Sequence, residues 1–74
     1  MNQYGRRIKA FRNAAGMTQT QLAVKTDVDP AHICRIEQGK VACSIALLQK
    51  IATALGVPVS KLLEDDEVPK ASNE

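Results

Sequence analysis

Two helix starts that follow each other closely constrain the fold of this chain more than any other feature. In the stretch "MTQTQL", the hydroxyl of Thr18 can cap a helix, and Gln21 at the third helical position can reach back to the capping residue. Further along, Asp29 supplies a second helix cap, and Pro30 suits the first position of the helix that follows. The sequence therefore predicts two helices in quick succession.

The connection between these helices fixes how they pack. The pattern predicts helices over about 19–25 and 30–38, with only residues 26–28 between them. A connection this short makes two helices cross at a steep angle instead of lying antiparallel. Asp27 falls where the chain turns sharply, and Asp tolerates a left-handed backbone better than most residues. Helices of this length are unstable alone, so both must pack against neighbours.

Apolar residues with helical spacing continue on both sides of this pair, and no stretch alternates convincingly with a period of two. A first helix is expected over about 3–15, ending at Gly16, and its apolar stripe consists of Tyr4, Ile8, Phe11 and Ala15. Ser44 can cap a fourth helix that ends at Gly56, and its apolar face consists of Ile45, Leu48, Ile51, Ala52 and Leu55. The fold class predicted is all-α.

The C-terminal part is expected to hold a short fifth helix around 61–67, followed by a flexible tail over 68–74. The 74 residues suffice for one small domain, here 1–67, whose core alone supplies little net stability. There is no signal-peptide segment and no apolar run near the roughly 20 residues that span a bilayer, which predicts a cytoplasmic protein without a membrane partner.

Charge is distributed unevenly along the chain. Up to Lys40 there are seven Lys and Arg against three acidic residues, a net charge of +4. Beyond Lys40 there are three Lys against five acidic residues, a net charge of −2. This asymmetry favours a polyanionic partner that contacts one face only.

The predicted helix over 30–38 divides its side chains between two faces. At about 100° per residue, Ile33 and Ile36 fall together and face the core. The opposite face carries Ala31, Cys34, Arg35 and Gln38, with His32 and Glu37 at its borders. Nothing bulky on this face would keep the backbone away from a grooved surface. A short helix of this kind after a tight turn can enter the DNA major groove, where an Arg pairs with guanine.

Two long stretches carry a resemblance to a known family. "MTQTQLAVKTDVDPAHICRIEQGK", followed by "SIALLQKIATALGVPVSKLL", resembles the phage-repressor and Cro-type helix-turn-helix family, also called the XRE family. The similarity covers residues 5–64. It implies a compact five-helix, lambda-repressor-like domain whose second and third helices form the helix-turn-helix. It also implies sequence-specific binding of double-stranded DNA as a two-fold dimer, usually for transcriptional repression.

The resemblance also implies roles for individual residues. The base-reading positions would be Pro30, Ala31, Cys34 and Arg35. Phosphate contacts would come from Gln19, Gln38 and Lys40, and Arg12 would pair with Glu37 to brace the recognition helix. The position of His32 at the border of the helix face independently predicts a polar contact at the groove edge. The chain departs from the family at Asp27, where Gly is usual, and at Cys43, where many members have Pro. Pro30 and Ala31 stand where several members have hydrogen-bonding side chains, so they offer only apolar contact, for example to a thymine methyl group.

The C-terminal apolar residues predict self-association. A short terminal helix cannot bury all of them within one subunit, and they are Val57, Val59, Leu62 and Leu63. A symmetric homodimer through this end would place two recognition helices about 34–36 Å apart, one turn of a palindromic operator.

Other functions have less support from the same residues. One His and two scattered Cys do not form a metal-ligand set, and no Ser/His/Asp or Cys/His arrangement has a supporting third group. We therefore expect no enzyme activity, metal or cofactor. An antitoxin that binds a toxin and its own promoter is a second hypothesis, because residues 64–67 are acidic. A redox sensor using Cys34 is a third.

Overall fold

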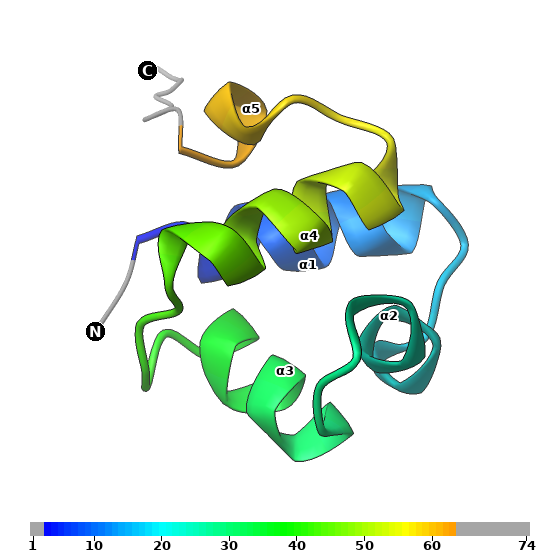
Figure 1. The fold of residues 1–74 in the computed structure, drawn as a ribbon, viewed down its shortest axis with the longest axis vertical. Helices are drawn as coiled ribbons and strands as arrows, with labels where there is room; N and C mark the ends of the chain where they lie inside the picture. Colours follow the sequence, from blue (N-terminus) through cyan, green and yellow to red (C-terminus); the bar gives the residue numbers. More distant parts are fainter. Residues whose placement is uncertain (1–2, 64–74) are drawn as a thin grey trace.

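Five helices follow one another in the computed structural model, which describes residues 3–63. They are α1 (Gly5–Ala14), α2 (Gln19–Thr26), α3 (Pro30–Glu37), α4 (Ile45–Leu55) and α5 (Val59–Leu63). In Figure 1, α1 and α4 lie side by side in the middle, with α2 and α3 on one side and α5 on the other. No strand occurs between residues 3 and 63, so the predicted all-α fold with α2 and α3 as the helix-turn-helix is confirmed.

Side-chain caps start the three central helices where the sequence predicts them. At α2 the Gln21 N–H donates to Thr18 Oγ1 over 3.0 Å, and the Thr18 N–H donates to Gln21 Oε1 over 2.8 Å. At α3 the Asp29 carboxylate accepts the Ala31 N–H at 2.7 Å. At α4 the Ser44 hydroxyl accepts a backbone N–H at 3.1 Å. Each cap satisfies a donor that a helix start leaves unpaired.

A left-handed residue closes each of the first four helices. At the end of α3, for example, Gly39 has φ 78° and the Lys40 N–H donates back to the Arg35 carbonyl over 3.0 Å. This is the Schellman arrangement, in which glycine is the usual left-handed residue. At α2 that residue is Asp27, with φ 59° and ψ 43°. Asp27 is the only residue other than glycine with positive φ between positions 3 and 63.

Several predicted boundaries need correction. The first helix is shorter than 3–15, and Ala15 lies beyond its end as an exposed residue instead of on the buried stripe. Ile45 is 65% exposed because its first-turn position in α4 leaves it outside the core. The fifth helix starts at Val59, earlier than expected, since the carbonyl of Pro58 already accepts the Lys61 N–H at 3.0 Å. Residues 64–74 lie outside the described residues.

The core is formed where all five helices meet. Its fully buried large side chains are Ile8, Leu22, Ile33, Ile36, Leu48, Ile51 and Leu62. Each such Leu or Ile contributes roughly 1.5–3 kcal/mol by leaving water. Leu62 corrects the predicted dimer interface: it is 0% exposed and belongs to the core of one subunit. Leu63, by contrast, is 48% exposed.

Polar contacts join α1 to α5 and to the α3–α4 loop. The Arg7 Nε–H donates to the Lys61 carbonyl of α5 over 2.6 Å, and its guanidinium lies 5.7 Å from the centre of the Phe11 ring. The Tyr4 hydroxyl accepts the Cys43 N–H at 2.8 Å and donates to the Cys43 carbonyl at 3.4 Å. These bonds hold α5 and the α3–α4 loop against α1. No helix within residues 3–63 is long and apolar enough to cross a bilayer.

Candidate nucleic-acid interface

The outward face of α3 carries the side chains that the sequence assigned to base reading. Pro30, Ala31 and Arg35 are exposed, and Cys34 is half-buried. The opposite face is anchored in the core through Ile33 and Ile36. Because α3 lies at the surface of the molecule opposite α5, this face is open to a large partner (Figure 1). Its predicted orientation is therefore present in the structure.

The residues expected to meet phosphates surround this face. Gln38 is exposed and caps the end of α3, and Lys40 is exposed directly beyond it. The backbone bond from Lys40 to the carbonyl of Arg35 keeps the two cationic residues at the same end of α3. His32 and Gln19 are each half-buried at the border of the face. These positions form a polar rim around a small apolar and cationic centre.

A buried ion pair braces α3 from behind. Arg12 Nε donates to Glu37 Oε2 over 2.6 Å, and Arg12 Nη2 donates to Glu37 Oε1 over 3.0 Å. Arg12 Nη1 also donates to the Met17 carbonyl in the α1–α2 loop over 2.8 Å. Arg12 is 7% and Glu37 8% exposed, so neither charge faces water. The pair that the resemblance implied is thus present, and it links α1 to the end of α3.

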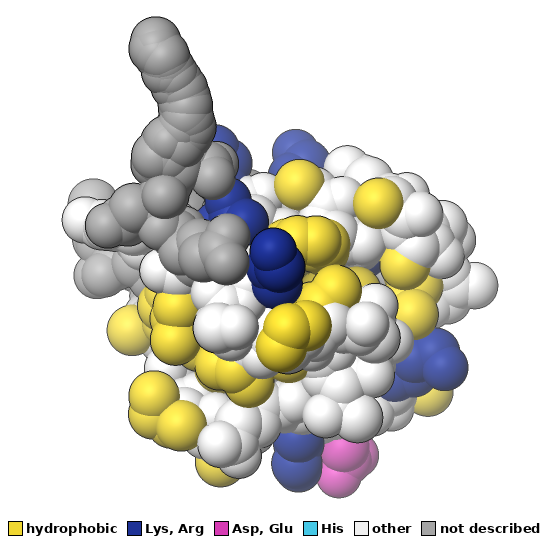
Figure 2. Space-filling view, turned by 90° about the horizontal axis from the view of Figure 1, so that it is seen from above, with side chains coloured by type: hydrophobic (Ala, Val, Ile, Leu, Met, Phe, Trp, Pro, Cys, Tyr) yellow, Lys and Arg dark blue, Asp and Glu magenta, His cyan; other side chains and the backbone are white. Residues whose placement is uncertain are grey.

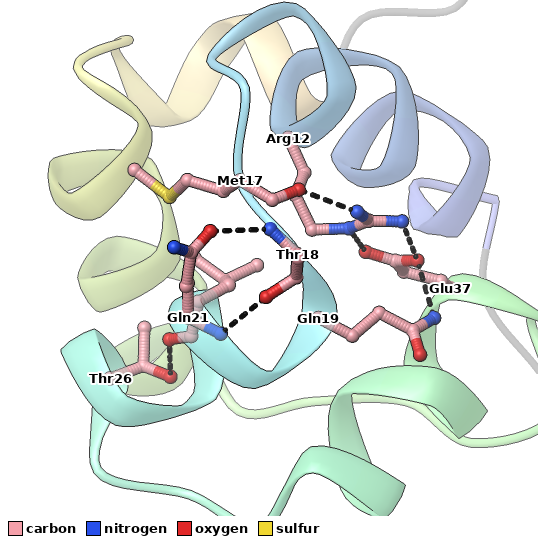
Figure 3. A network of polar contacts seen from close by, with 8 residues as sticks. Arg12, Met17, Thr18, Gln19, Gln21, Thr26 and Glu37 are labelled. Carbon is pink, nitrogen blue, oxygen red and sulfur yellow. Dashed lines mark hydrogen bonds and ion pairs between the residues drawn. The ribbon is translucent and has the colours of Figure 1, made fainter.

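Gln19 takes part in the same network, a contact that the sequence pattern did not predict. Its Nε2 donates to Glu37 Oε1 over 2.9 Å, so the start of α2 is joined to the end of α3 (Figure 3). The expectation from the resemblance was a phosphate contact alone. The bond could have been predicted from the position of Gln19, which opens a helix that packs against the helix carrying Glu37.

The electrostatics of the face favour an anion. Glu37, the only acidic residue of α3, is neutralised by Arg12, which leaves Arg35 and Lys40 as the exposed charges at the end of the helix. The Asp29 carboxylate at the other end accepts a backbone N–H of α3, where the helix dipole favours negative charge. A polyanion such as DNA would therefore be attracted to the end of α3.

The cysteines differ in their surroundings. Both are free thiols and half-buried, Cys34 on the outward face of α3 and Cys43 against the core. Burial raises the pKa of the Cys43 thiol above its ordinary value, which keeps it protonated at neutral pH. Within residues 3–63 no three His, Cys, Asp or Glu side chains gather in a way that could hold a metal ion.

Comparison with known proteins gives consistent matches. The family model described as "Helix-turn-helix" matches residues 8–62. The immunity repressor protein of Bacillus phage phi105 is 35% identical over 66 residues, which are 89% of this chain and 46% of that protein. Control protein C.MunI of a Mycoplasma species is 32% identical over 65 residues, which are 86% of this chain and 88% of that protein. The chain thus spans about half of the phage relative and most of the control protein.

Solved structures give the same picture. SinR of Bacillus subtilis, a master regulator for biofilm formation, has been crystallised in complex with DNA. That structure has a TM-score of 0.78 at 33% identity and covers 84% of this chain and all of the other. SinR in complex with SinI has a TM-score of 0.83 at 32% identity and covers 88% of this chain and 64% of that chain. The residues matched by the family model, 8–62, include the outward face of α3 and its brace.

Proposed function

We propose, from the premise that this chain belongs to the helix-turn-helix family of transcriptional regulators, that it is a sequence-specific DNA-binding regulator that reads a major groove with α3. The observation that carries this proposal is the outward face of α3, where Arg35 projects from a helix braced by the Arg12–Glu37 pair. The SinR–DNA complex supports DNA binding by a protein of similar fold.

In the proposed docking, the centre of the face contacts bases and its rim contacts the DNA backbone. Arg35 donates to O6 and N7 of a guanine, the commonest specific pairing in major grooves. Pro30, Ala31 and Cys34 add only close apolar contacts, so the remaining specificity comes from thymine methyl groups and DNA shape. The rim residues contact the sugar-phosphate backbone, and they are Gln19, His32, Gln38 and Lys40.

We propose repression as the regulatory outcome. A helix-turn-helix domain that binds an operator can repress most simply by excluding other proteins from that DNA. The name of one relative, an immunity repressor protein, supports this direction. Such a protein would work in the compartment that contains DNA.

A homodimer through the α5 end is part of the proposal. Figure 2 looks down on this end and shows hydrophobic side chains gathered around α5 and α4. At this end Leu63 is exposed and Val57 and Val59 are half-buried, whereas Leu62 is buried in the core. Two-fold pairing of this face would leave both α3 helices outward, about 34–36 Å apart on one side of a duplex. Sedimentation that finds only monomers at tens of micromolar, with and without operator DNA, would contradict it.

Selection from random DNA tests the function. The purified protein is used to recover duplexes from a randomised pool, and its affinity for the best duplex is compared with that for a scrambled duplex at equal salt. A sequence-specific regulator should prefer the recovered duplex by about 10³-fold or more. The best sites should contain two similar half-sites about one helical turn apart. Equal affinity for both duplexes would contradict the proposal.

A protein partner is the second candidate, and the complex of SinR with SinI favours it for this fold. The acidic cluster 64–67 that first suggested a toxin partner lies outside the described residues. Co-expression with the product of an adjacent gene, followed by size-exclusion chromatography, tests this candidate. Loss of DNA binding in such a complex is the result expected for an antagonist.

A further inference from the structure

Glu37 contacts two residues that belong to different parts of the candidate interface. Its Oε2 accepts from Arg12, and its Oε1 accepts both from Arg12 and, over 2.9 Å, from the side-chain amide of Gln19 (Figure 3). The first contact braces α3 from inside the protein. The second reaches the half-buried rim, where Gln19 opens α2. The Glu37 carboxylate therefore connects Arg12 in the interior with Gln19 at the rim.

The chemistry of this contact fixes which way the Gln19 amide faces. An ionised carboxylate can only accept hydrogen bonds, and a carboxamide has a donor side and an acceptor side. If the Gln19 amide turned over, its oxygen would face Glu37 Oε1, and two acceptors would be held together at the edge of the core. The Gln19 NH₂ group therefore faces Glu37, and the hydrogen bond to Glu37 Oε1 uses one of the two amide hydrogens. The second hydrogen remains available.

We propose that Glu37 is a positioning residue for DNA binding: it holds the Gln19 carboxamide so that the second amide hydrogen donates to a backbone phosphate. The inference rests on the proposed function, because it needs DNA against α2 and α3. It assigns Glu37 an effect on affinity that is separate from its effect on stability. Because the phosphate contact is independent of sequence, this effect is the same for every duplex.

The hydrogen bonds of Arg12 restrict the movement of Glu37 and so of the Gln19 amide. Arg12 holds both oxygens of Glu37 and also binds the Met17 carbonyl, which lies just before the cap of α2. The start of α2 and the end of α3 are thus fixed to the same guanidinium. A hydrogen-bonding group that is already oriented loses less freedom on binding than a free side chain, which increases affinity.

A double-mutant cycle on binding to random-sequence duplex tests the inference. Gln19→Met keeps the length of the side chain, removes the phosphate donor and leaves the Arg12–Glu37 pair in place. It should weaken binding roughly tenfold, as expected for a hydrogen bond to a charged group. Glu37→Gln should weaken binding severalfold through loss of orientation. Random-sequence duplex reports backbone contacts and not base reading by the braced α3. On this duplex the double variant should bind no more weakly than Gln19→Met, because the effect of Glu37 on the phosphate contact passes through Gln19.

Lys40 provides the matched control, since its exposed side chain belongs to the rim while the hydrogen bonds of Glu37 go to Arg12 and Gln19. Losses from Lys40→Ala and Glu37→Gln should multiply. All binding is measured where circular dichroism shows the variants folded. If losses at positions 19 and 37 also multiply, or if Glu37→Gln leaves affinity unchanged, the inference is wrong. If the wild type shows no DNA binding at all, the proposed function fails instead.

A measurement on the wild-type protein covers the case in which Glu37→Gln does not fold. The side-chain amide of Gln19, observed by NMR in the free protein, should exchange with water more slowly than that of the exposed Gln38. Addition of random-sequence duplex should then shift the Gln19 amide signals. Free exchange at Gln19, or unchanged signals in the presence of bound DNA, would overturn the inference.

Discussion

Arg12 and Glu37 show how single residues stabilise this small domain. Both side chains are buried, and each takes part in three hydrogen bonds that no apolar residue could replace. The pair matters less for the energy it adds than for the energy lost when one member is left alone. An unpaired buried charge costs far more than a neutral replacement of both.

Replacing only one member should therefore be worse than replacing both. Arg12→Met should lower the free energy of unfolding by about 3–5 kcal/mol, because it leaves the Glu37 carboxylate buried without its partner. The double variant Arg12→Met/Glu37→Leu should lose clearly less than the sum of the two single losses. Urea denaturation in a stabilising sulfate buffer measures all three. Strictly additive losses would mean that the two charges are not coupled in the folded protein.

Cys43 and Tyr4 give the stability a dependence on alkaline pH. Burial raises the pKa of the Cys43 thiol above its ordinary 9.0, and burial likewise raises the pKa of the Tyr4 hydroxyl above 10.0. A group with a higher pKa in the folded state holds its proton more tightly there. Its stabilising effect is complete below the unfolded pKa and is lost as pH rises through the folded value.

The free energy of unfolding should thus fall as pH rises above about 9, and more steeply above about 10. Urea denaturation of the wild type and of Cys43→Ala between pH 7 and 11, roughly the span that contains both ordinary pKa values, measures this. The difference between the two proteins should change across the alkaline range and stay constant below it. A constant difference at every pH would show that the thiol keeps its ordinary pKa in the folded protein.

At the scale of elements, the helix starts could be predicted and the packing of the helix faces only in part. Thr18, Asp29 and Ser44 cap where expected because capping depends on a few consecutive residues. Ala15 and Ile45 were assigned to buried faces because periodicity shows spacing but not which turns other helices cover. The start of α5 depended likewise on a backbone bond to Pro58 that spacing does not show.

In the turn between α2 and α3, the strained backbone of Asp27 is predicted to lower stability. Its left-handed backbone costs a residue with a side chain roughly 1–2 kcal/mol, whereas glycine adopts it freely. Asp27→Gly should raise the free energy of unfolding by about 0.5–1 kcal/mol after allowance for the extra freedom of glycine when unfolded.

Thermal unfolding of Asp27→Gly and of the control Asp27→Asn separates backbone strain from charge. Asn removes the charge of Asp and tolerates the same backbone, so it should change stability less than Gly does. Equal stabilisation by Asn and Gly would mean that charge, not the backbone, limits stability at this turn.

At the scale of the whole molecule, the sequence predicted which face is presented but overstated its charge. The outward face of α3 could be predicted because it depends on the spacing of residues within one helix. The basic first half of the chain, however, includes Arg7 and Arg12, which bind α5 and Glu37 instead of facing a partner. Such long-range contacts join residues far apart in the chain, and no local pattern contains them. Leu62 was misassigned to a dimer surface for the same reason.

The central claim is that α3 reads base pairs while the rim holds the backbone. The most direct test compares Arg35→Ala with Lys40→Ala, each measured on the selected duplex and on a scrambled duplex at equal salt. Arg35→Ala should cost about 1–3 kcal/mol on the selected duplex and much less on the scrambled one, whereas Lys40→Ala should weaken both alike. If Arg35→Ala leaves the preference for the selected duplex unchanged, α3 does not read the DNA as described.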